Sequence, residues 1–112
     1  MTECNQVVIL VTVETLEEAR RIADRLLEQR KAACVNIVPK VDSHFWWEDK
    51  LETTQEVLMI IKTRASLVDE VVGLVSELHS YEVPEVIALP IIGGNRDYLK
   101  WIDEKVRELN KS

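Results

Sequence analysis

The fold is decided by residues 32–63, AACVNIVPKVDSHFWWEDKLETTQEVLMIIKT, which contain two long extended stretches separated by a polar break at Glu48–Lys50. β-Branched and aromatic residues are frequent in both stretches, so the segment predicts a β-hairpin. Proline cannot donate a hydrogen bond within a sheet, and Pro39 therefore predicts an interruption in the first arm. We expect arms of this length to extend beyond a compact domain.

The segment before the hairpin predicts a strand followed by a helix. Residues 6–13 form an almost unbroken aliphatic run, which is typical of a central strand buried on both faces. Thr15 is the expected N-cap of the helix, and Glu18 would complete a capping box. Apolar residues then recur at helical spacing, and we expect the helix to end near Lys31.

The segment after the hairpin predicts a helix, a strand and a closing helix. The second helix should begin at Ser66 and stop before His79, and residues 85–92 (EVIALPII) predict a strand. Asn95 is the expected N-cap of the last helix. The order βαββαβα, in a single domain over residues 1–112, predicts an α+β, ferredoxin-like split βαβ sandwich. In that fold both main helices cover one face of a four-stranded antiparallel sheet.

The predicted strands are also apolar on the face that the helices leave bare. Several of them carry apolar residues at consecutive positions, so both faces of the sheet avoid water and a partner should cover the second one. Adjacent residues of a strand point to opposite faces, so Trp46 and Trp47 cannot enter the same core. We expect one of them to pack in the subunit's own layer and the other against a neighbouring chain. The alternative is an isolated tryptophan at the rim.

Composition limits the class of protein and its partners. A chain of 112 residues with 46% hydrophobic and 30% charged residues is typical of one soluble domain. Its net charge of −6 argues against nucleic acid and anionic membrane surfaces as partners. The sequence has no apolar run of membrane-spanning length and no signal-peptide pattern, so we expect a cytoplasmic protein. Cys4 and Cys34 are expected to be free thiols.

Chemical motifs are scarce. The sequence contains no phosphate-binding glycine motif and no pattern typical of a hydrolase. The polar loop from Leu78 to Glu85 contains His79, which either complements the end of the preceding helix or acts as a metal ligand. Cys34 is either a small buried apolar residue or a thiolate ligand. If the fold or the assembly brought His79 and Cys34 together, they would form a soft site suited to copper or zinc.

Four segments of the sequence resemble successive blocks of the CutA family, the divalent-cation tolerance proteins. In order along the chain they are AACVNIVP, FWWEDKLETTQEVLMIIKT, HSYEVPEVIALPI and GNRDYLKWI. The resemblance covers nearly the whole chain and implies a ferredoxin-like fold. It also implies a compact homotrimer similar in architecture to the PII signalling proteins, in agreement with the apolar second face of the sheet.

The resemblance also implies candidate site residues. Copper binding is the usual proposed role of the family, and in one bacterial member the ligands are a cysteine and two consecutive histidines. The matching positions here are Val11, Leu78 and His79, so only His79 is retained. The positions that line the cleft between subunits in the family are matched by a set of five residues: Cys34, Trp47, Lys62, Tyr81 and Glu85.

Three functional hypotheses follow. The first is a homotrimeric divalent-cation (copper) tolerance or metal-response protein that binds without turnover. The second is a PII-like signalling module that binds a small anionic ligand or a protein partner in inter-subunit clefts, with Lys62 supplying positive charge. The third is an enzyme in which Tyr81 and Glu85 act as acid and base beside Lys62.

Overall fold

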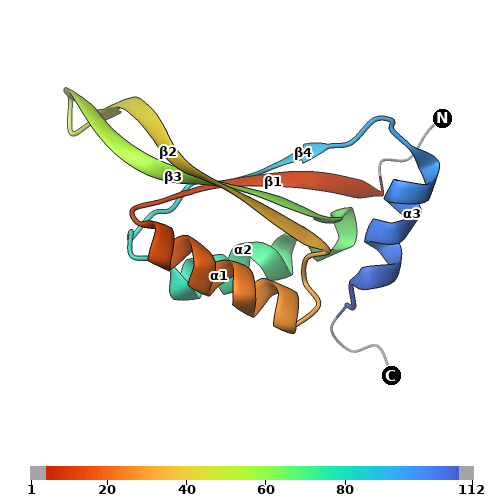
Figure 1. The fold of residues 1–112 in the computed structure, drawn as a ribbon. Helices are drawn as coiled ribbons and strands as arrows, with labels where there is room; N and C mark the ends of the chain where they lie inside the picture. Colours follow the sequence, from red (N-terminus) through yellow and green to blue (C-terminus); the bar gives the residue numbers. More distant parts are fainter. Residues whose placement is uncertain (1–4, 109–112) are drawn as a thin grey trace.

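The computed structural model describes residues 5–108 and confirms the predicted order of elements (Figure 1). The elements are β1 (Gln6–Val13), α1 (Leu16–Glu28), β2 (Cys34–Trp47), β3 (Lys50–Arg64), a short 3-10 turn (Ala65–Leu67), α2 (Val68–Leu78), β4 (Val86–Pro90) and α3 (Arg96–Lys105). The strands form one antiparallel sheet in the order β2-β3-β1-β4. This is the predicted ferredoxin-like split βαβ arrangement.

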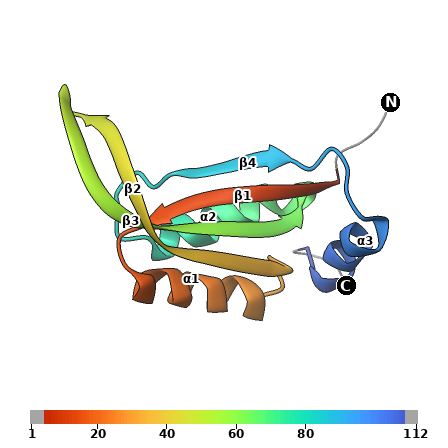
Figure 2. The ribbon, with the colours of Figure 1, turned by 45° about the horizontal axis from the view of Figure 1, so that its top comes forward.

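The hydrophobic core lies between the sheet and the two main helices. Figures 1 and 2 show α1 and α2 on one face of the sheet and α3 at the end where β1 begins. Alternate residues of β1 face the helices and are buried, because successive side chains of a strand point to opposite faces. The fully buried core side chains include Ile9, Val11, Ile22, Leu26, Met59, Ile61, Val71 and Val75.

The opposite face of the sheet, which we call the second face, is not covered by any helix within residues 5–108. The remaining residues of β1 are only partly buried, so the expected burial of residues 6–13 on both faces is met on one face. Ile87 and Leu89 of β4 pair with Leu10 and Val8, and they are 49% and 47% exposed. The apolar side chains of the second face include Val8, Leu10, Leu58, Ile60, Ile87 and Leu89. An apolar sheet face of this kind is typical of an interface.

The hairpin formed by β2 and β3 extends well past the helices (Figures 1 and 2). A β-bulge interrupts β2 between Val38 and Val41, which confirms the irregularity predicted at Pro39, although the strand continues to Trp47. Glu48 and Asp49 connect the arms, and both have positive φ angles, 49° and 64°. Two such residues are what a two-residue turn between antiparallel strands requires.

The prediction that one of the two adjacent tryptophans packs in the chain's own layer is wrong. Trp46 and Trp47 pair with consecutive residues of β3, Leu51 and Lys50, so they point to opposite faces as expected. Neither packs in the chain's own layer, however, because they are 70% and 60% exposed. The physical reason is that the outer part of the hairpin extends beyond α1 and α2, which therefore cannot cover it.

The caps of the helices confirm two predictions and correct a third. The Thr15 hydroxyl accepts a hydrogen bond from the Glu18 backbone N–H at 3.1 Å, and the Asn95 side chain caps α3. The Glu18 carboxylate does not complete the capping box. It instead accepts hydrogen bonds from Ser80, from the backbone N–H at 2.8 Å and from the hydroxyl at 3.0 Å. Helix α1 also ends at Glu28, earlier than the expected Lys31.

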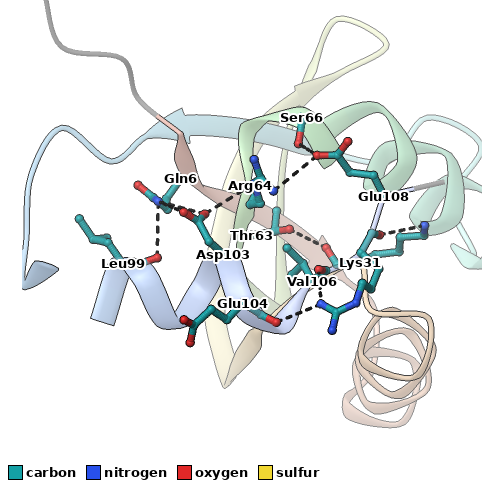
Figure 3. Close-up of polar contacts among 11 residues, drawn as sticks. Gln6, Lys31, Thr63, Arg64, Ser66, Leu99, Asp103, Glu104, Val106 and Glu108 are labelled. Carbon is teal, nitrogen blue, oxygen red and sulfur yellow. Dashed lines mark hydrogen bonds and ion pairs between the residues drawn. The ribbon is translucent and has the colours of Figure 1, made fainter. Parts of the chain in front are cut away.

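Polar contacts attach α3 to the end of the sheet (Figure 3). The Gln6 side-chain amide donates to both carboxylate oxygens of Asp103, at 3.0 and 3.1 Å. The Arg64 Nε atom lies 3.6 Å from the same carboxylate. Ile102 of α3 is fully buried. Helix α3 is therefore fixed at the end of the sheet opposite the tip of the hairpin.

Candidate binding groove

A groove of about 970 Å³ lies on the second face, where the base of the outer hairpin meets the loop between α2 and β4. Four glutamates line it: Glu52, Glu56, Glu82 and Glu85. Three aromatic side chains also line it: Phe45, Trp47 and Tyr81. None of the described lining residues is a lysine or an arginine. We call this site the acidic groove.

The β-bulge determines which residues of β2 reach the acidic groove. Before the bulge, Val35 and Ile37 pair with Ile61 and Met59 and face the helices. The bulge places one extra residue in β2, which reverses the faces of all later positions. After it, Phe45 pairs with Glu52, and the aromatic residues join the glutamates of β3 on the groove side.

Tyr81 and Glu56 form a partly buried pair in the wall of the groove. The Tyr81 hydroxyl donates a hydrogen bond to Glu56 Oε2 at 2.8 Å, and Glu56 is only 8% exposed. Burial raises the pKa of Tyr81, and the hydrogen bond to Glu56 raises it further. The phenol therefore stays protonated at neutral pH and serves as a hydrogen-bond donor.

His79 and Glu18 position the loop that carries Tyr81. His79 Nε2 lies 2.7 Å from the backbone oxygen of Thr12, and the Tyr81 backbone N–H donates to His79 Nδ1 at 3.0 Å. These contacts assign a neutral ring with its proton on Nε2. Both ring nitrogens are therefore occupied, and the Glu18 carboxylate holds Ser80 next to them.

The structure divides the predicted cleft residues into two groups. Trp47, Tyr81 and Glu85 line the acidic groove together. Cys34 and Lys62 are cross-strand partners near the other end of the sheet, where the Lys62 ammonium lies 5.8 Å from the centre of the Tyr98 ring. One chain thus assembles only part of the predicted cleft.

The predicted metal ligands are not assembled within one chain. His79 is buried with both ring nitrogens hydrogen-bonded, whereas the Cys34 thiol lies 3.7 Å from the Asn36 side chain on another part of the sheet. Within residues 5–108 no group of three histidine, cysteine or acidic side chains is placed to hold a metal ion. Cys34 is a free cysteine, and Cys4 lies outside the described residues.

Sequence reasoning missed several residues of the site. Glu18 had a detectable signal, its place three residues after Thr15, but that signal was interpreted as a capping box. Glu52 and Glu56 stand at alternate positions of a predicted strand, which indicates one common face. The residues of β2 that share this face depend on the bulge in β2, and they could not be read from the alternation alone.

Comparisons with known proteins agree on one family. The model of the family described as "CutA1 divalent ion tolerance protein" matches residues 7–105. The chain is 49% identical over 107 residues to "Protein CutA 1, chloroplastic" of Oryza sativa subsp. japonica, covering 96% of this chain and 60% of that protein. It is 51% identical over 98 residues to "Divalent-cation tolerance protein CutA" of Archaeoglobus fulgidus, covering 88% and 95%.

Solved structures give the same result for the fold. The structure of CutA1 from Oryza sativa has a TM-score of 0.90 at 48% identity and covers 96% of this chain and 99% of its own. A divalent cation tolerance protein from Thermus thermophilus has a TM-score of 0.89 at 44% identity, covering 91% and 99%. In the part of the chain that the structure describes, no helix is long and apolar enough to cross a membrane.

Proposed function

Because the chain belongs to the CutA1 divalent ion tolerance protein family, we propose that it responds to divalent cations, copper among them, by binding in clefts between the subunits of a homotrimer. The observation that carries this proposal is the position of the acidic groove beside the uncovered apolar second face. Association over that face would bring a second copy to the groove. Four carboxylates there would attract cations.

The division of the predicted cleft residues supports an assembly with clefts between copies. Trp47, Tyr81 and Glu85 lie at one end of the sheet, and Cys34 and Lys62 lie at the other. The two groups can form one cleft only if they come from different copies. Contacts of this head-to-tail kind generate closed rings, and a trimer similar to the PII proteins is such a ring.

Metal ligation by His79 and Cys34 would likewise require two copies. His79 would also have to give up one of its hydrogen bonds, to Thr12 or to the Tyr81 backbone. The family cysteine position is Val11, which is fully buried in the core and offers no donor atom. We therefore propose that copper binding is weak and depends on assembly.

Copper titration of the assembled protein tests this proposal. Wild type, His79→Ala and Cys34→Ser are titrated at neutral pH under reducing conditions, and the mass of each is measured by sedimentation. We expect binding to wild type and weaker binding to both variants. Tight binding of equal strength in all three proteins would reject His79 and Cys34 as ligands.

The second hypothesis, a signalling module for a small anion, has one supporting contact, the ammonium of Lys62 beside the Tyr98 ring. The four glutamates of the acidic groove oppose an anion in the same cleft. Titration with adenine nucleotides distinguishes the two hypotheses, since saturable nucleotide binding without copper binding would favour the second. We propose that the protein acts without turnover in either case, because the raised pKa of Tyr81 makes it a poor acid.

The cytoplasm is the compartment that we propose. Relatives carry other compartments in their names, chloroplastic for the rice protein and periplasmic for the archaeal structure. Fractionation of the source cells with an antibody against the chain would test the proposal.

A further inference from the structure

Glu56 and Lys62 of β3 carry opposite charges on the same face of the sheet. The residues between them alternate, and Leu58 and Ile60 share the second face with both. Six positions of a strand span about 20 Å, so the two side chains do not meet within one chain. The second face therefore has an acidic end, an apolar middle and a basic end.

The negative charge at the acidic end is not compensated within the described chain. Glu56 is 8% exposed, and the group that donates to its Oε2 atom, the Tyr81 hydroxyl, is neutral. Within residues 5–108 no lysine, arginine or histidine forms an ion pair with Glu56. Because burying a carboxylate without a cation is unfavourable, Glu56 is suited to a cation that comes from outside the chain.

The positive charge at the basic end also lacks an opposite charge. The Lys62 ammonium lies 5.8 Å from the centre of the Tyr98 ring, and no carboxylate of the described residues forms an ion pair with it. Arg64, the next cation on this face of β3, differs in this respect (Figure 3). Its guanidinium lies 3.6 Å from the carboxylates of Asp103 and Glu108. Of these two cations, Lys62 is the one that stays available to a second chain.

A second copy over the apolar middle can meet these charges in two ways. If like ends came together, the glutamates of one acidic groove would oppose those of the other, and like charges at an interface repel. If opposite ends came together, the partner subunit's Lys62 would reach Glu56, and the same contact would cover the apolar side chains. Charge complementarity therefore favours a second copy of this chain placed head to tail.

We propose that Lys62 of each subunit forms an ion pair with Glu56 of the next, and that this pair sets the register of the assembly. The inference rests on the proposed homotrimer and adds the contact that orients its subunits. The phenol of Tyr81, the carboxylate and the incoming ammonium would form one connected network. The neighbouring subunit thus supplies the cation that the described lining of the acidic groove lacks.

A double-mutant cycle on the dissociation of the full-length assembly, followed by sedimentation on dilution, tests the proposal. Glu56→Gln removes the charge and keeps an oxygen that can accept from Tyr81, and Lys62→Gln removes the ammonium. Each single change leaves the other charge at the interface without a partner. It should raise the protein concentration at which the assembly dissociates by about tenfold or more. The double variant should dissociate at a concentration well below that given by multiplying the two effects.

Lys100→Gln is the matched control, because it removes an exposed lysine of α3. It should shift dissociation little, and its effect should simply multiply with that of Glu56→Gln. Where Glu56→Gln does not fold, Lys62→Glu carries the test, since it should weaken assembly far more than Lys100→Glu. Equal weakening by these two reversals would overturn the proposal.

The result of the cycle also separates this inference from the proposed function. Simple multiplication of the effects of Glu56→Gln and Lys62→Gln in a protein that assembles would overturn the ion pair and leave the homotrimer standing. A wild-type protein that sediments as a monomer would overturn both. The copper titration is independent, because neither Glu56 nor Lys62 is a proposed copper ligand.

Discussion

Replacing Glu18 by alanine should destabilise the protein far more than its position on a helix surface suggests. The Glu18 carboxylate is buried and accepts two hydrogen bonds from Ser80, at 2.8 and 3.0 Å. Hydrogen bonds to a charged group contribute about 1.5–3 kcal/mol each, but Ser80 is exposed and its groups regain water in the variant. We therefore expect the free energy of unfolding to fall by about 2–4 kcal/mol. This figure includes the lost interaction between an acidic side chain in the first turn and the helix dipole.

Denaturant unfolding at a fixed protein concentration measures this loss, because the stability of an assembly depends on concentration. The matched control is Glu17→Ala, which removes the neighbouring glutamate in the same turn of α1, where the side chain is exposed. Exposed substitutions of this type change stability by about 0.5 kcal/mol or less. Equal losses in the two variants would refute the role of Glu18 as the anchor of the loop that ends in the acidic groove.

Two further predictions concern assembly and pH. Replacing Trp47 by alanine should make the assembly dissociate at a higher protein concentration than Lys105→Ala does, since exposed aromatic residues are the usual anchors of interfaces. Equal sedimentation profiles of the two variants on dilution would contradict this. The raised pKa of Tyr81 means that its contribution to stability is complete below the pKa of an unfolded tyrosine, about 10, and declines as the pH rises above that value. Tyr81→Phe should therefore lose less stability than wild type between neutral and strongly alkaline pH, and parallel declines would show that the phenol does not contribute.

The order of elements could be predicted because the signals that define it are local. Apolar periodicity located the strands and helices, Thr15 and Asn95 marked two helix starts, and Pro39 marked the bulge. Each of these signals depends on residues within one turn of a helix or one segment of a strand. The topology then followed from the small number of ways in which this order can be folded.

The site could be predicted only in part because its contacts join distant segments. Glu18 and Ser80 are 62 positions apart, and Glu56 and Tyr81 are 25 apart, so no sequence pattern links either pair. The two tryptophans show a different obstacle. The prediction that they point to opposite faces was correct. Whether either side chain is buried depends on how far the helices extend beneath the sheet, and both are exposed. The resemblance placed Trp47, Tyr81 and Glu85 in one cleft, and the structure brings these three together in the acidic groove.

The length of the hairpin has a consequence for local unfolding. Beyond the bulge, β2 and β3 are held by each other, and none of the helices in the described part of the chain packs beneath the outer hairpin. Segments with few buried apolar contacts open at a smaller free-energy cost than the whole domain. The tip of the hairpin can therefore open transiently while the core beneath β1 stays intact, and Trp47 would then leave the groove while Tyr81 and Glu56 remain in place. A neighbouring subunit or a ligand that contacts both sides of the groove would suppress this opening, so the order of the hairpin reports occupancy of the site.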